Sequence, residues 1–283
     1  MPFATGHGGA QIYYETTGDR GPWVVLIQGL GLSSRFWFQM PRLLADDPEH
    51  PHRVIVLDNR GTGRSGRPRF PYRMAHMADD VAAVIRAAGV GQVVVCGISM
   101  GGMVAQEVAL RHPTLVRGLV LLATWAGIPH VQLPSPTALA TLVSLPFRAG
   151  RSRGRALARL LLPRTQVRLA KDLMGAWPAA LAADPTEPRA FFAQLAAAAL
   201  HTTGFRLKQI LCPTVVVCGE EDAIMRMKNA EILAARIPNA TLEILPGVAH
   251  GIPMTDERAI ARAVAHISNA TRDSRSGTAA RPA

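Results

Sequence analysis

The chain has 283 residues, 48% of them hydrophobic, and a formal net charge of +11. This length and composition suit one large α/β domain with an insertion. No stretch reaches the roughly 18 uninterrupted apolar residues of a membrane span, and no run alternates basic and aromatic residues, so neither a membrane-spanning segment nor nucleic-acid binding is expected.

The cysteines and the first residues give an expectation about the compartment. Cys96, Cys212 and Cys218 form an odd set without the spacing of a disulfide framework, and we interpret them as small buried hydrophobic residues. Residues 1–7 lack the basic and apolar regions of a signal peptide. A reducing, cytoplasmic location is therefore expected.

Short runs of β-branched residues alternate with helical patterns along most of the chain. These patterns predict strands at 10–16, 23–28, 53–58, 92–96, 116–123, 213–218 and 240–245. Helices are predicted at about 36–46, 76–88, 103–112, 226–236 and 255–268. The glycine-rich run 59–66 has neither G-x-G-x-x-G nor a P-loop lysine, so we interpret it as a structural turn. The alternation is typical of a mostly parallel sheet with helices on both faces.

The alternation stops near Trp125. From residue 126 to about residue 206 the pattern is one of Leu/Ala/Arg helices separated by prolines, which predicts a helical cap inserted into a core of residues 1–125 and 207–270. The polar residues 271–283 are expected to be a disordered tail. No acidic residue occurs between Glu107 and Asp172, whereas arginines cluster at 148, 151, 153, 155, 159, 164 and 168. These arginines indicate either solvated helix faces or attraction of an anionic substrate or membrane surface.

The stretch Gly97-Ile98-Ser99-Met100-Gly101-Gly102 lies between a predicted buried strand and a predicted helix. The glycines allow a strained turn at Ser99 and close packing of the helix on the strand. The helix N-terminus offers free N–H groups to a developing oxyanion. In sequence and in context, this stretch resembles the nucleophile elbow, G-x-S-x-G, of the α/β-hydrolase family.

The family's chain order of nucleophile, acid and histidine is met by Ser99, Asp222 and His250. The acid and the histidine fall in loops after predicted parallel strands, on the same sheet edge as Ser99. Glu220 and Glu221 remain local alternatives to the acid. Among the histidines, His250 alone follows the last predicted strand in a Gly-flanked loop, which resembles the family's histidine loop.

A tetrahedral intermediate needs at least two N–H donors. The backbone amide of Met100 follows the nucleophile, and the backbone amide of Leu30 lies in the loop after residues 23–28. The family often has His-Gly-x-Gly at this loop, whereas Gln28 stands here in place of the histidine, which alters a contact behind the donor. Trp125, Met103 and His201 are expected to line the substrate pocket.

The resemblance covers about residues 10–270 and implies an eight-stranded sheet without a metal or an organic cofactor. Within the superfamily, the chain looks most like capped esterases, lactonases and cofactor-free haloperoxidases. The expected function is cleavage of a small-molecule carboxylic ester or lactone through an acyl-enzyme. The alternatives are a thioester or carbon–carbon bond as the target, perhydrolysis, or a ligand-binding protein with negligible turnover.

Overall fold

The computed structural model describes residues 3–68, 71–167, 183–184 and 186–276. Its centre is an eight-stranded sheet in the order β1-β2-β4-β3-β5-β6-β7-β8. The pairs β1–β2 and β2–β4 are antiparallel, and the other neighbouring strands are parallel. The strands are β1 (Phe3–Thr5), β2 (Gln11–Thr17), β3 (Trp23–Ile27), β4 (Arg53–Leu57), β5 (Val93–Ile98), β6 (Val116–Leu122), β7 (Thr214–Gly219) and β8 (Ala240–Leu245). The predicted mostly parallel eight-stranded sheet is confirmed.

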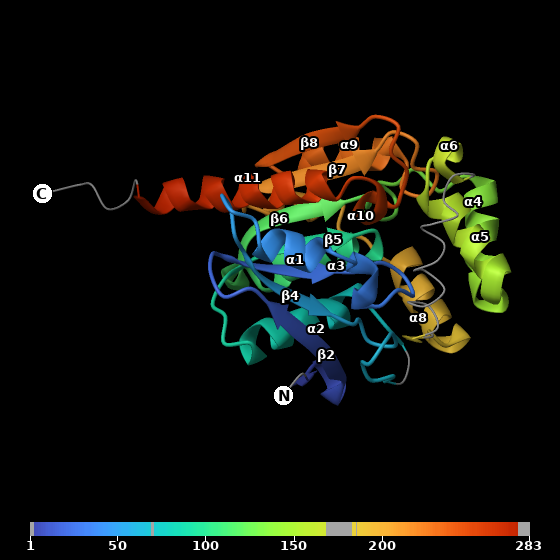
Figure 1. Cartoon of the computed structure of the whole chain (residues 1–283), viewed down its shortest axis with the longest axis horizontal. Coiled ribbons are helices and arrows are strands. Elements are labelled where there is room, and N and C mark those ends of the chain that lie inside the picture. Colours follow the sequence, from blue (N-terminus) through green and yellow to red (C-terminus); the bar gives the residue numbers. More distant parts are fainter. Residues whose placement is uncertain (1–2, 69–70, 168–182, 185, 277–283) are drawn as a thin grey trace, which may run out of the picture.

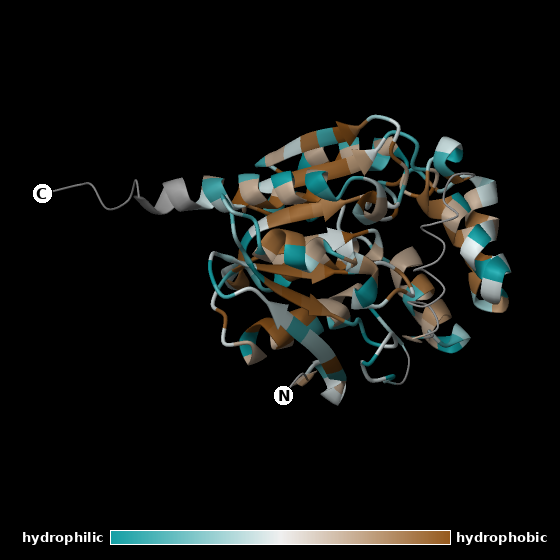
Figure 2. Cartoon of the chain, viewed as in Figure 1, coloured by the Kyte–Doolittle hydropathy of each residue, from teal (hydrophilic) through white to brown (hydrophobic). Residues whose placement is uncertain are grey.

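Helices cover both faces of the sheet (Figure 1), and every residue of β5 and β7 is therefore buried. The α-helices described outside residues 126–206 are α1 (Met40–Ala45), α2 (Met74–Ala87), α3 (Met100–Arg111), α9 (Met227–Arg236), α10 (Ile252–Thr255) and α11 (Glu257–Ser276). Short 3-10 helices are η1 (His7–Gly9), η2 (Ser34–Trp37), η3 (Pro113–Leu115) and η5 (Leu207–Gln209). Figure 2 shows the hydrophobic strands in the centre and hydrophilic residues on the outward side of the helices.

Three local predictions need correction. The sequence pattern does not predict strand β1, because this strand has only three residues, all of which pair with β2. The helix predicted at 36–46 is divided into η2 and α1, since Phe38 between them adopts a positive φ of 48°. Residues 271–276, predicted to be disordered, continue α11. Thr271 is buried there, and its hydroxyl accepts a hydrogen bond from Arg117 Nε at 2.7 Å. Residues 277–283 lie outside the described residues.

The range 126–206 is called the cap segment below, and its described residues lie beyond the carboxyl edge of the parallel strands (Figure 1). The described helices of this segment are α4 (Pro136–Ser144), η4 (Leu145–Phe147), α5 (Gly150–Leu161), α6 (Arg164–Val167) and α8 (Pro188–Ala199). In the described part of the segment, β structure is limited to one bridge between Gly127 and Thr202. No helix in the described residues is both long and apolar enough to cross a membrane.

Candidate active site

Ser99 lies on a strained turn between β5 and α3, with a φ of 56°. A Cβ at Gly97 would overlap the carbonyl oxygen of Gly101, and a Cβ at Gly101 would overlap the carbonyl oxygen of Ile27. The Thr124 hydroxyl donates to the Ser99 carbonyl at 2.7 Å and helps to hold the turn. The two glycines are therefore required by close backbone approach, and the turn presents Ser99 at the first turn of α3.

Asp222 and His250 are brought together from the loops after β7 and β8. His250 Nδ1 and Asp222 Oδ2 are 2.7 Å apart, and both side chains are buried. Asp222 Oδ1 accepts hydrogen bonds from the backbone N–H groups of Ile224 and Met225, each at 2.8 Å. Both carboxylate oxygens therefore have partners, which fixes the carboxylate relative to the imidazole.

The two local alternatives to Asp222 point elsewhere. Glu220 and Glu221 are exposed. Glu220 accepts a hydrogen bond from the backbone N–H of Gly247 at 3.2 Å. Of the three acidic residues, Asp222 is the one that is buried against His250.

The loop 29–34, called the L30 loop below, passes over Ser99. A Cβ at Gly29 would lie 3.3 Å from Ser99 Cβ and 3.8 Å from Ser99 Oγ. The backbone N–H of Gly29 donates to Gln28 Oε1 at 2.8 Å, so the glutamine side chain is bonded to the first residue of the loop. Met100 is the first residue of α3, and its N–H has no intrahelical acceptor. Leu30 and Met100 both line a cavity above Ser99.

A cavity of about 230 Å³ lies between the sheet edge and the cap segment. Ser99, His250 and Gln28 are polar residues of its wall, while most of the remainder is apolar. The cap segment contributes mainly leucines, namely Leu133, Leu139, Leu142, Leu145, Leu157, Leu160, Leu161 and Leu195. The cavity therefore suits a molecule with a polar reacting group and an apolar body.

Of the three residues predicted to line the pocket, Trp125 and Met103 lie in the cavity wall. His201 is absent from the described wall, and that prediction is wrong. Its ring is buried, and its Nε2 lies 3.3 Å from the Thr203 hydroxyl oxygen. That hydroxyl donates to Gln106 Oε1. Burial, and secondarily the charge of Arg206, lowers the pKa of His201 to about 3. The ring is thus a neutral part of the packing beside the cavity.

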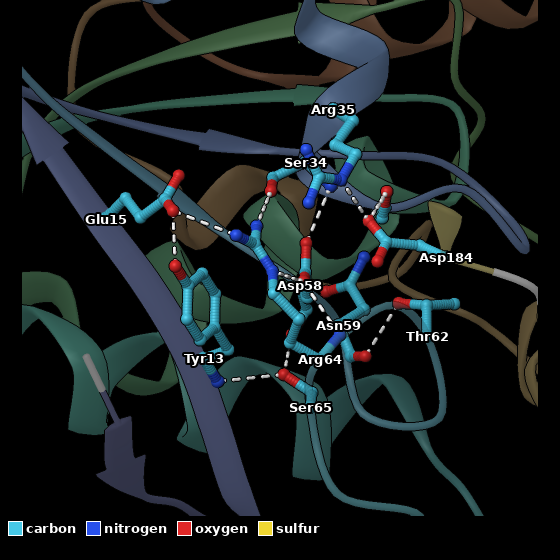
Figure 3. Close-up of polar contacts among 11 residues, drawn as sticks. Tyr13, Glu15, Ser34, Arg35, Asp58, Asn59, Thr62, Arg64, Ser65 and Asp184 are labelled. Carbon is cyan, nitrogen blue, oxygen red and sulfur yellow. Dashed lines mark hydrogen bonds and ion pairs between the residues drawn. The ribbon is translucent and has the colours of Figure 1, made fainter. Parts of the chain in front are cut away.

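A polar network behind the L30 loop was not anticipated from the sequence (Figure 3). Buried Asp58 accepts hydrogen bonds from the backbone N–H of Ser34 at 2.8 Å and from Arg64 Nε at 3.0 Å. Arg64 also donates to the Ser34 hydroxyl at 3.0 Å and forms an ion pair with Glu15 at 2.8 Å. Asp58 and Ser34 are 24 positions apart, so no local spacing could have indicated this support.

No group of three His, Cys, Asp or Glu that could hold a metal occurs among the described residues. In α5, Arg151, Arg155 and Arg159 are exposed, whereas Arg153 is half-buried and burial lowers its pKa. Arg168 lies outside the described residues. Attraction of an anionic substrate or membrane surface stays a prediction.

A family model described as alpha/beta hydrolase fold matches residues 22–257. The chain belongs to the α/β-hydrolase fold family. Two relatives of this hydrolase are putative carbamate hydrolases named RutD. The one from Caulobacter sp. (strain K31) is 31% identical over 89% of this chain and 94% of its own length. The one from Azorhizobium caulinodans is 41% identical over 126 residues, which are 44% of this chain and 45% of that protein.

Other α/β hydrolases resemble the chain over most of its length. A poly(3-hydroxyalkanoate) depolymerase from Ectopseudomonas oleovorans is 30% identical over 78% of this chain and 76% of its own length. The structure of a thermophilic esterase from Thermogutta terrifontis superimposes with a TM-score of 0.78 at 26% identity, covering 95% of this chain and 98% of that chain. The chain is thus a hydrolase of this fold, and the names of its relatives indicate different substrates.

Proposed function

We propose that this hydrolase cleaves a carboxylic ester or lactone with Ser99 as nucleophile, His250 as general base and Asp222 as the partner that orients the imidazole. The observation that carries the proposal is the buried 2.7 Å contact between His250 Nδ1 and Asp222 Oδ2, beside a cavity that Ser99 also lines. With Nδ1–H donated to the carboxylate, Nε2 carries the free lone pair that a base needs.

The reaction proceeds through an acyl-enzyme. Ser99 Oγ attacks the carbonyl carbon while His250 takes its proton, and the backbone N–H groups of Leu30 and Met100 donate to the oxyanion. Collapse of the tetrahedral intermediate expels the alcohol, which receives the proton from His250. Water, activated by the same imidazole, then releases the acid. Asp222 stays ionised and stabilises the imidazolium.

The apolar wall of the cavity favours an ester with an apolar acyl group. The esterase and the depolymerase among the similar proteins support an ester, whereas the name of the RutD proteins points to a carbamate. A wall made chiefly of apolar side chains would offer few hydrogen-bond partners to the polar groups of a small carbamate. We therefore favour the ester, and a carbamate, a thioester, a carbon–carbon bond or perhydrolysis is an alternative for the same three residues.

The test is hydrolysis of p-nitrophenyl butyrate and octanoate by the wild-type protein and by Ser99→Ala, with labelling by a fluorophosphonate. We expect turnover and a label on the peptide containing Ser99, both lost in the variant. Labelling without turnover of any ester would argue for one of the other bonds. A folded wild-type protein that neither turns over nor takes the label would exclude the proposal and favour a ligand-binding protein.

A further inference from the structure

We propose that Gln194 and Thr186, two side chains of the cap segment, are positioning residues for the oxyanion donor Leu30. The inference rests on the proposed function, since it concerns the loop that supplies one of the two proposed N–H donors. It adds that this donor is held in place by the cap segment and not by the sheet core alone.

Both backbone groups of Gly31 are bonded to the cap segment. The Gly31 N–H donates to Gln194 Oε1 at 2.9 Å, and the Thr186 hydroxyl donates to the Gly31 carbonyl at 2.9 Å. Gln194 Nε2 donates in turn to the carbonyl of Arg60 at 2.8 Å. Gln194 is fully buried and Thr186 nearly so. Because an N–H faces one end of the amide and a carbonyl faces the other, the orientation of Gln194 is determined.

Helix α8 also packs directly on the turns at Gly31 and Gly61, which Gln194 of the same helix connects through its hydrogen bonds. Gly31 has a φ of 67°, and a Cβ there would lie 2.7 Å from Phe191 Cδ2. Gly61 has a φ of 84°, and a Cβ there would lie 3.0 Å from Ala190 Cβ. The contact is therefore close-packed as well as hydrogen-bonded, and the L30 loop has little room to move while α8 is in place.

A further contact of the cap segment lies at the far end of the L30 loop (Figure 3). Asp184 accepts hydrogen bonds from the Ser33 hydroxyl at 3.0 Å and from Arg35 Nε at 2.7 Å. On the core side, Asp58 accepts from the backbone N–H of Ser34. The loop is thus held by the core at Ser34 and by the cap segment at Gly31 and Ser33, and Arg35, the residue just after the loop, also bonds to the cap segment.

The hydrogen bonds of Gly29 and Gly31 restrict the position of Leu30, which lies between them in the chain. The N–H of Gly29, just before Leu30, is fixed by Gln28, and the N–H of Gly31, just after it, is fixed by Gln194. The peptide that carries the Leu30 N–H lies between these two fixed peptides. Loss of the Gln194 hydrogen bond would free the peptide on the Gly31 side of Leu30. A donor stabilises an oxyanion most when its position is fixed before the reaction starts. Since the charge on the carbonyl oxygen develops in the transition state, the loss should appear in kcat and not in KM.

The experiment compares four variants with the wild type on p-nitrophenyl octanoate. Gln194→Met keeps the length of the side chain without its amide, and Thr186→Val keeps the shape without the hydroxyl. Thr186→Ser restores the hydroxyl. Ala197→Gly lies in the same helix and weakens it without removing a side-chain hydrogen bond. Melting temperature, kcat, KM and inhibition by a trifluoromethyl ketone, which forms an oxyanion with the serine, are measured for each.

We expect Gln194→Met and Thr186→Val each to lower kcat about tenfold, with KM within about twofold and inhibition by the ketone weakened in parallel. Thr186→Ser and Ala197→Gly should keep kcat within about twofold, although Ala197→Gly melts at a lower temperature. Unchanged kcat in both of the first variants, or an equal loss in Ala197→Gly, would overturn the inference. Absence of Ser99-dependent turnover in the wild type would overturn the proposed function itself, and that result precedes any comparison of variants.

Discussion

The Asp222 carboxylate differs from its neighbours in sequence in three ways: it is buried, it accepts hydrogen bonds from two backbone N–H groups, and it contacts His250. In Asp222→Asn, the amide can keep those backbone bonds only by presenting its NH₂ to His250, which favours the wrong tautomer of the ring. We expect kcat to fall by about 10⁴ with KM within a few-fold. Steady-state kinetics and a melting curve would check this.

The matched control for that substitution is Glu220→Gln, two positions earlier. Its side chain is exposed and accepts one backbone hydrogen bond, from Gly247. This variant should retain kcat within about twofold. If Glu220→Gln were as damaged as Asp222→Asn, the choice of Asp222 as the orienting acid would be mistaken.

His201 gives a prediction about stability at acid pH. Burial, more than the charge of Arg206, lowers the pKa of this ring from 6.5 to about 3 in the folded state. The unfolded chain therefore binds a proton at His201 near pH 6.5, whereas the folded chain does so only near pH 3, and acidification favours unfolding. Between pH 7 and pH 5 the contribution of this residue to the unfolding free energy should fall by about 2 kcal/mol.

Urea denaturation of the wild type and of His201→Gln at both pH values would measure that contribution. The variant should lose less stability between pH 7 and pH 5 than the wild type does. His266→Gln is the control, since His266 is exposed on α11. A wild type and a His201→Gln protein with the same pH dependence would show that the buried ring is not responsible.

At the scale of elements, the β5–α3 turn depends on how closely the helix approaches the sheet. A Cβ at Gly101 would overlap the carbonyl oxygen of Ile27 in β3, and a backbone atom cannot move aside as a flexible side chain can. We expect Gly101→Ala to lower the unfolding free energy by about 3 kcal/mol and to reduce kcat as the turn is displaced.

Gly154 gives the opposite expectation within a helix. It lies in α5, with no heavy atom within 4 Å of a Cβ built there. Gly154→Ala should raise the unfolding free energy by about 0.5–1 kcal/mol, because alanine restricts the unfolded chain and favours the helix. Urea denaturation of both variants tests the pair, and a stabilised Gly101→Ala would contradict the packing argument.

At the scale of the whole molecule, the cavity exists because the cap segment lies across the carboxyl edge of the sheet. Its wall joins Ser99 and His250 of the sheet edge to leucines of the cap segment. The octanoate ester has four more methylenes than the butyrate ester, and each one removed from water contributes about 0.8 kcal/mol, so kcat/KM should rise by up to about 200-fold from butyrate to octanoate. Leu157→Phe, which fills part of the cavity from α5, should reduce that ratio and leave butyrate hydrolysis little changed. A ratio near one in the wild type would argue against an apolar acyl site.

Much of the fold and the identity of the candidate residues were predictable from local patterns. The strands were evident because β-branched runs and their Gly, Pro and polar boundaries are local features, and Ser99 was evident because a strand, G-x-S-x-G and a helix follow one another directly. Asp222 and His250 were predicted from chain order and sheet edge. Their catalytic roles stay a prediction, although the structure places them 2.7 Å apart.

The tertiary structure decided which side chains are buried together, and that depends on contacts between distant positions. Gln194 and Gly31 are 163 positions apart, and neither has a local pattern that indicates the other. The same reason explains two wrong predictions. The place of the His201 ring depends on its contact with Thr203, and the place of Thr271 depends on its hydrogen bond from Arg117. Neither contact can be inferred from a local pattern. Periodicity records which face of an element is apolar, whereas the partner that covers that face is fixed only when the chain has folded.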